Sequence, residues 1–155
     1  MRKTAAKKKP IKADPKYHDT LVTRFVNSLM YDGKKSTAFT VFYDAIDLVS
    51  QRTQEDGIGV WKRALTNVMP SVEVKSRRVG GATFQIPTEI RPARRVAVGI
   101  QWLIMYSRKR NEKSMAQKLA GEIVAASKEE GAAFKKKEDT HRMAEANKAF
   151  SHFRF

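Results

Sequence analysis

Residues 72–95 differ from the rest of this chain because their apolar side chains alternate with polar ones, the period of two that is typical of a β-strand with one buried face. Gly80-Gly81 lies between the two alternating runs, and this dipeptide tolerates the positive φ angles of a tight hairpin turn. Pro87 has no backbone N–H, so its strand is expected at a sheet edge. The sequence therefore predicts a β-hairpin over residues 72–90 with the apolar face Val72, Val74, Phe84, Ile86 and Ile90.

Such a hairpin needs a surface to lie against, because an isolated two-stranded ribbon is marginally stable in water. Two interpretations are open. In the first, the hairpin is a nucleic-acid-binding arm. In the second, its apolar face packs flat on helices and its basic side chains are merely solvated. The base can also pack while the tip stays free. The basic residues concerned are Lys75, Arg77 and Arg78 near the tip and Arg91, Arg94 and Arg95 at the base.

Outside the hairpin, apolar residues recur every three or four positions, which predicts amphipathic helices. The sequence predicts a mainly α fold, a bundle of about six helices with one protruding β-hairpin between the third and fourth helices. Residues 1–13 are expected to be a disordered basic arm, and residues 14–155 a single helical domain. Capping and breaking residues set the expected helices: a first from Asp19 or Thr20 to Gly33, a second from Ser36 or Thr37, a third from Asp56-Gly57 to Pro70, a fourth opening with Pro92, a fifth from Ser114 to Gly131, and a last from about Asp139 to Phe150.

The charge of the chain indicates a polyanionic partner. Lys and Arg total 31 against 16 Asp and Glu, which gives a net charge of +15 and a pI near 10.2. The chain has no cysteine, which excludes disulfides and thiolate metal sites and fits a reducing compartment. Its three histidines are scattered, no apolar run is long enough for a membrane span, and no nucleophile-plus-base motif is present. We therefore expect no enzyme, cofactor, metal, membrane or small-molecule substrate.

The basic residues gather at termini, turns and helix ends, where a bundle can bring them together into one positive surface. Two kinds of partner fit this pattern: a folded RNA, or a DNA duplex whose minor groove receives the hairpin of an architectural protein. The second usually requires a two-fold dimer, and no exposed apolar seam predicts one. Tyr31 or Phe84 could stack on an unpaired base, although strand packing is the simpler role for Phe84. The RNA-binding candidates are Arg2, Lys3, Lys7, Lys8, Lys9, Lys34, Lys35, Lys75, Arg77, Arg91, Arg94, Arg95, Arg108, Arg110, Lys113 and Lys136, the last from a predicted loop at Lys135–Lys137.

The hairpin sequence resembles a known signature. The residues from Val72 to Gly81, followed by Thr83, Gln85, Pro87, Glu89, Arg91-Pro92 and Arg94-Arg95, are similar to those of the bacterial small-subunit ribosomal protein number seven family (universal uS-seven). The similarity extends from about Asp14 to the end of the chain. Further matching blocks are Phe25–Asn27, Leu29-Met30, Asp32–Ala38, Asn67-Val68 with Pro70, Lys113–Ala116 and His141–Phe150.

This resemblance implies a cytoplasmic ribosomal protein that is a primary binder of 16S rRNA and nucleates assembly of the head of the small (30S) subunit. It implies a position at the subunit interface near the exit (E) site, with small-subunit ribosomal proteins nine and eleven as neighbours. The hairpin tip and the last helix would approach exit-site tRNA and mRNA. The residues carried over to that role are Arg78, Gly80, Gly81, Thr83, Arg142, Met143, Asn147 and Lys148.

Overall fold

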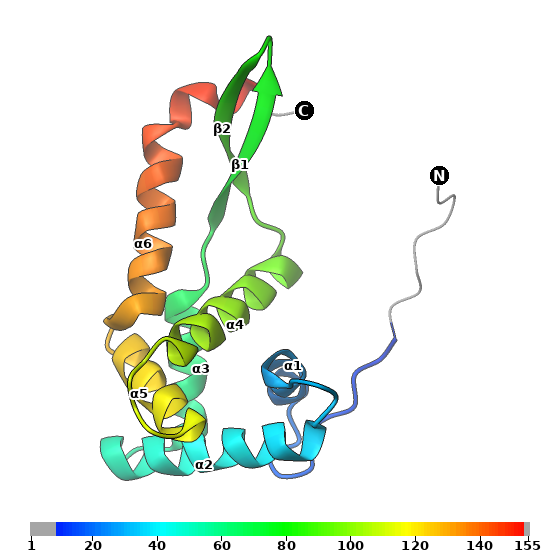
Figure 1. The fold of residues 1–155 in the computed structure, drawn as a ribbon, viewed down its shortest axis with the longest axis vertical. Helices are drawn as coiled ribbons and strands as arrows, with labels where there is room; N and C mark the ends of the chain where they lie inside the picture. The colour runs from blue at the N-terminus through cyan, green and yellow to red at the C-terminus, as the bar shows by residue number, and fades with distance from the viewer. Residues whose placement is uncertain (1–8, 154–155) are drawn as a thin grey trace.

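The structure is a computed structural model that describes residues 9–153, and it confirms a mainly α fold with a hairpin between the third and fourth of six α-helices (Figure 1). Arg2, Lys3, Lys7 and Lys8 lie outside the described residues. The elements in chain order are α1 (Thr20–Leu29), α2 (Lys35–Thr53), α3 (Gly57–Val68), β1 (Val72–Val79), β2 (Ala82–Glu89), α4 (Pro92–Arg108), α5 (Met115–Ser127), α6 (Gly131–Ala146) and the 3₁₀ helix η1 (Lys148–Phe153).

The core lies between α1, α2, α3, α4 and α5. Its centre is an aromatic cluster in which Phe25 of α1 meets Trp61 of α3 with ring centroids 5.5 Å apart, and Phe42 of α2 meets Trp61 at 5.3 Å. All three side chains are fully buried, so they anchor three helices to one another. The apolar stripes predicted from the sequence are therefore core faces, as expected for amphipathic helices.

The end of the chain differs from the prediction. The sequence places the fifth helix up to Gly131, a loop at Lys135–Lys137 and a helix from about Asp139; in the structure α5 ends at Ser127 and α6 already begins at Gly131. Glu129 and Gly131 have positive φ angles of 63° and 89°, which stop α5 and redirect the chain. The buried carboxylate of Glu122 accepts the N–H of Ala133 and so stabilises the start of α6. The lysine run is therefore helical, and the predicted loop is wrong.

The hairpin is packed at its base and exposed at its tip. Its strands are antiparallel with Val79 opposite Ala82, and Gly80 and Gly81 close the turn with φ angles of 56° and 89°. Ile86 and Ile90 are buried, whereas the residues around the turn are exposed. Phe84 packs against Phe150 of η1 with ring centroids 5.1 Å apart. The second interpretation is thus correct for the packed base, the tip stays exposed, and nucleic-acid binding by the hairpin stays a prediction.

One buried carboxylate helps to hold the segment before α1 against the bundle, together with the ion pair of Lys16 with Asp47. Asp14 is 1% exposed and accepts the hydroxyl of Tyr43 at 2.6 Å and the backbone N–H groups of Lys16 and Tyr17 at 3.0 and 2.8 Å. Burial, together with the hydrogen bond to Asp14, raises the pKa of Tyr43 to about 12. Because this hydroxyl is the one side-chain donor from the bundle to Asp14 among the bonds of the described residues, Tyr43 sets where the N-terminal segment leaves the core.

Tyr43→Phe is expected to lower the free energy of unfolding by about 1–2 kcal/mol, because it leaves the buried Asp14 carboxylate short of a donor. The raised pKa of Tyr43 also predicts that its contribution is complete below pH 10 and is lost as the pH rises toward about 12. Urea unfolding near neutral pH and between these two pH values measures both effects. Tyr31→Phe, at a 62% exposed ring, is the control and should change stability by less than about 0.5 kcal/mol.

Candidate nucleic-acid interface

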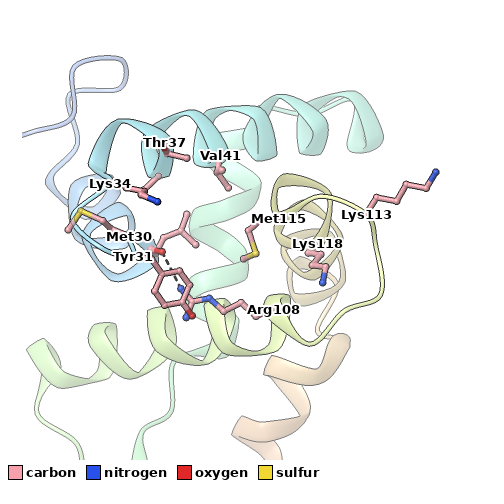
Figure 2. A pocket seen from close by; sticks show the side chains of 11 residues that line it. Met30, Tyr31, Lys34, Thr37, Val41, Arg108, Lys113, Met115 and Lys118 are labelled. Atoms are coloured by element: carbon pink, nitrogen blue, oxygen red, sulfur yellow. Dashed lines mark hydrogen bonds between the residues drawn. The ribbon is translucent and has the colours of Figure 1, made fainter.

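A groove with an apolar floor and a cationic rim lies where the α1–α2 turn, the end of α4 and the start of α5 meet (Figure 2). Its volume is about 520 Å³. Lys34 comes from the N-cap of α2, Arg108 is the last residue of α4, and Lys113 belongs to the α4–α5 loop. Two of the predicted basic clusters, the Lys34-Lys35 turn and the Arg108–Lys113 loop, therefore converge on one site. We call it the lysine groove, and its lining residues are Leu29, Met30, Tyr31, Lys34, Thr37, Ala38, Val41, Arg108, Lys113, Met115 and Lys118.

One wall of the lysine groove is built by Arg108 and Tyr31. The guanidinium carbon of Arg108 lies 4.0 Å from the centroid of the Tyr31 ring, and its Nη2 donates to the carbonyl of Leu29 at 3.1 Å. The ring of Tyr31 is thus fixed although it is 62% exposed. Arg108 occupies one face of the ring, so the stacking predicted for Tyr31 is limited to the other face.

Sequence reasoning did not identify several residues of the groove, among them Lys118 and Met115. Lys118 was not included among the basic clusters because it lies inside α5 and not at a helix end; its position four residues after the cap Ser114 was the available signal. Met115 was assigned to the apolar stripe of the core, but its side chain points into the groove, whereas that of Lys113 points away from it (Figure 2). Periodicity alone cannot distinguish the residues of a helix that line a groove from those that pack in the core.

The cations at the base of the hairpin are partly used within the protein. Glu73 of β1 pairs with Arg94 at 2.9 Å and with Lys75 at 3.1 Å. Partial burial raises the pKa of Glu73, but the hydrogen bonds from Arg94 and Lys75 outweigh it, so its pKa lies below the usual value. Arg95 donates from Nε to the carbonyl of Pro70 at 3.1 Å. Arg91, by contrast, is exposed ahead of α4.

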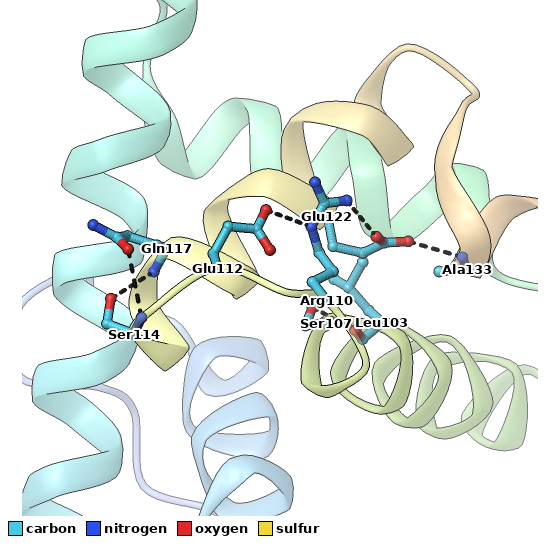
Figure 3. Close-up of polar contacts among 8 residues, drawn as sticks. All are labelled: Leu103, Ser107, Arg110, Glu112, Ser114, Gln117, Glu122 and Ala133. Carbon is cyan, nitrogen blue, oxygen red and sulfur yellow. Dashed lines mark hydrogen bonds and ion pairs between the residues drawn. The ribbon is translucent and has the colours of Figure 1, made fainter.

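The guanidinium of Arg110 pairs with carboxylates of the protein itself rather than facing outward (Figure 3). Its guanidinium pairs with Glu112 at 2.7 Å and with Glu122 at 3.0 Å. The hydrogen bond to Glu112, opposed by burial and reinforced by Glu122, raises the pKa of Arg110, and the same guanidinium lowers the pKa of Glu112. Of the cations predicted to bind RNA, Arg110 is therefore the one most committed to internal carboxylates among the described residues.

The hairpin lies beside the end of α6 and η1, as Figure 1 shows, and the contact of Phe84 of β2 with Phe150 of η1 joins the hairpin to this end of the chain. The two sets of residues predicted to lie near tRNA and mRNA therefore share one end of the molecule. From the tip these are Arg78, Gly80, Gly81 and Thr83, all exposed; from α6 and beyond they are the exposed Arg142, Met143 and Lys148 and the half-buried Asn147.

The remaining RNA-binding candidates are distributed over the surface. Lys9 and Lys35 are exposed, Lys35 beside the ring of Phe39 at 5.7 Å. Arg77 lies opposite Phe84 near the hairpin tip, and Lys136 is half-buried on α6. Within residues 9–153, no group of His, Cys, Asp or Glu side chains is arranged to hold a metal ion, and no helix is long and apolar enough to cross a membrane.

Comparison with known proteins identifies the family. Residues 1–148 match the family described as Ribosomal protein S7p/S5e. The chain is 68% identical to the small ribosomal subunit protein uS7 of Flavobacterium psychrophilum, over all of both chains. It is 66% identical to the protein of that name from Cytophaga hutchinsonii, again over all of both chains, and 59% identical to that from Gemmatimonas aurantiaca over 99% of each. The chain therefore belongs to the ribosomal protein S7p/S5e family, as a structural and non-enzymatic protein of the small ribosomal subunit, and so of the cytoplasmic ribosome.

Proposed function

We propose that this protein is a primary binder of 16S rRNA that nucleates assembly of the head of the 30S subunit. The observation that carries the proposal is the lysine groove, where cations from three separate segments surround an apolar floor. A duplex presents its phosphates on a regular surface, whereas a folded RNA also presents unpaired bases. A groove with both cations and an apolar floor suits the second kind of partner.

The groove matches an unpaired nucleotide in its chemistry. Lys34 and Lys118 supply charge for phosphate oxygens, and Met115 with the open face of Tyr31 supplies an apolar surface for a base. Stacking of this kind contributes about 1–3 kcal/mol per base. The protein would then recognise the shape of the RNA rather than its base sequence.

At the other end of the molecule, the exposed residues of the hairpin tip and of the end of α6 are the part that we propose lies near the exit site, beside tRNA and mRNA. The packed base holds the hairpin in place, so the tip acts as a steric and electrostatic boundary. Proteins nine and eleven of the small subunit are the proposed neighbours. Family membership removes the support for the alternative of a DNA-architectural protein.

Reconstitution of the small subunit tests the assembly role. In a mixture of 16S rRNA and purified small-subunit proteins, omission of this chain should greatly reduce incorporation of protein nine, because a primary binder organises the RNA that later proteins contact. Quantitative mass spectrometry of the sedimented particles measures incorporation. Equal incorporation of protein nine with and without this chain would overturn the proposed role in assembly.

Arg77→Ala combined with Arg78→Ala tests the tip. We expect the bundle to stay folded, because both residues are exposed near the end of the hairpin. Reconstituted subunits should release exit-site tRNA faster, since two cations are removed from the boundary. The control is Arg52→Ala with Lys128→Ala, which removes the same charge from exposed positions at the ends of α2 and α5. Collapse of the fold in the Arg77/Arg78 variant would instead favour a hairpin packed flat along its length.

A further inference from the structure

The hairpin joins the bundle through a short hinge, residues 69–71, and three basic side chains hold this hinge and the last turn of α3 before it. Lys137 of α6 donates to the carbonyl of Asn67 at 2.8 Å, and Arg95 of α4 donates to the carbonyl of Pro70 at 3.1 Å. His141 of α6 accepts the backbone N–H of Ser71 at its Nε2, at 3.1 Å, with the hydroxyl of Ser71 3.3 Å from the same nitrogen. We call Lys137, Arg95 and His141 the hinge clasp.

The three members of the hinge clasp respond differently to pH. Lysine and arginine donate hydrogen bonds throughout the physiological range, so their contacts with the two carbonyls persist. Histidine accepts a hydrogen bond only when the ring is neutral and the accepting nitrogen carries no proton. The contact with Ser71 therefore requires neutral His141 with its proton on Nδ1. Protonation of His141 would place the Nε2–H group of its ring against the backbone N–H of Ser71, so that two donors face each other.

We propose that His141 is a positioning residue for the hairpin, one that fixes the hinge only while its imidazole is neutral. Ser71 is the residue at which the hairpin begins, since its carbonyl also accepts the N–H of Ile90 at 3.1 Å. A rotation of about 10° at this point would move a tip roughly 25 Å away by about 4 Å. A small rotation permitted by the loss of one hydrogen bond at the hinge therefore becomes a displacement of several ångströms at the tip.

The charges around His141 favour the neutral ring. Burial, followed by the charges of Lys137 and Arg95, lowers the pKa of His141 below 6.5. A protonated His141 would be the third cation of the clasp, with no carboxylate among the causes of its shift. The carboxylates on the elements next to it are Glu73 of β1, which is paired with Lys75 and Arg94, the exposed Glu89 of β2, and the exposed Glu138 and Glu145 and half-buried Asp139 of α6.

The sign of the pH effect follows from the lowered pKa. The folded state binds the proton less readily than the unfolded chain, so the contribution of His141 is present above pH 6.5 and is lost as the pH falls through the folded-state pKa. The contact between Phe84 and Phe150 does not titrate, and it still ties the hairpin to η1. Acid is therefore expected to loosen the hairpin without detaching it. This inference concerns the chain alone and does not depend on the proposed RNA contacts.

Distance measurements between two spin labels test the proposal. The sequence has no cysteine, so labels can be placed at Thr83→Cys near the hairpin tip and Asp44→Cys on α2, both exposed positions. Near neutral pH we expect a narrow distance distribution, and at an acid pH at which side-chain NMR shows His141 protonated a distribution broadened by roughly 4 Å. An unchanged distribution at the two pH values would overturn the proposal.

Two variants separate positioning from a general effect of acid. His141→Gln keeps an oxygen acceptor near the position of Nε2 and cannot titrate in this range, so its distribution should stay narrow at both pH values. His141→Leu removes the acceptor and should be broad at both. A glutamine variant that still broadens in acid would contradict the role of His141, because His18 and His152 remain in it.

A direct observation of the ring completes the test and does not depend on the leucine variant folding. Long-range ¹⁵N–¹H NMR of the histidine side chains should show His141 as the neutral tautomer with its proton on Nδ1 near neutral pH, identified by its absence from His141→Gln. Circular dichroism confirms that helix content is unchanged. A proton on Nε2 of His141 in the wild type would refute the acceptor role.

Discussion

Replacement of Glu122 by alanine is expected to lower the free energy of unfolding by about 3 kcal/mol, which corresponds to a fall in Tm of roughly 6–12 °C for a chain of this size. Glu122 is 1% exposed and satisfies two separate groups: Nη1 of Arg110 at 3.0 Å and the N–H of Ala133 at 2.8 Å (Figure 3). Its removal leaves a buried amide without an acceptor and half of a charge pair without its partner. Thermal unfolding followed by circular dichroism measures the loss.

Two further variants identify which contact matters. Glu122→Gln retains an oxygen for the N–H of Ala133 but loses the charge that faces Arg110, so it should be intermediate. Glu112→Ala removes the other carboxylate that pairs with Arg110. Because the side chain of Glu112 is 28% exposed, this variant should lower the free energy of unfolding by less than about 1 kcal/mol. If Glu122→Ala cost no more than Glu112→Ala, the start of α6 would not depend on the buried carboxylate.

The second large effect concerns RNA affinity. Lys34→Gln, Lys113→Gln and Lys118→Gln together remove the two lysines that face the lysine groove and Lys113, whose exposed side chain extends outward from its rim. Each phosphate contact contributes about 0.7–0.9 to the slope of log affinity against log salt, so three contribute roughly two log units at 0.1 M salt. We therefore expect about a hundredfold loss of affinity for 16S rRNA and a slope smaller in magnitude by about 2–3, measured by filter binding at several salt concentrations.

A charge-matched control shows whether position or net charge is responsible. Arg52→Gln, Arg63→Gln and Lys128→Gln remove three exposed cations that do not line the groove. In this variant the slope of log affinity against log salt should change by less than about 1. Equal losses in the two triple variants would mean that the groove is not a binding site and that affinity follows the total charge of the chain.

The hairpin and the amphipathic helices were predictable because each depends on short-range patterns. Alternation around Gly80-Gly81 requires a turn at that position, and the stripe that includes Phe25 requires one face of α1 to be buried. The start of α6 was not predictable, because it depends on Glu122, which precedes Ala133 by eleven residues and interacts with it only in the folded chain. The local excess of charge at Lys135–Lys137 suggested a loop instead.

The candidate site was predictable in composition but not in geometry. Basic residues at turns and helix ends indicated a polyanion, and Lys34, Arg108 and Lys113 do meet at one groove. Charge alone could not show that Arg110 is held by two carboxylates or that Arg94 is paired with Glu73. The pairs of Arg110 with Glu122 and of Arg94 with Glu73 join residues 12 and 21 positions apart, so they become visible only once the helices and the hairpin are placed.

The central claim is that a folded RNA surface, and not charge alone, is recognised. The most direct test is a salt titration of binding to the isolated head domain of 16S rRNA, with a DNA duplex of equal charge as competitor. The account predicts binding that falls steeply with salt, as expected for a chain of net charge +15, yet persists in an excess of duplex at each concentration. Equal competition by the duplex at every salt concentration would contradict it.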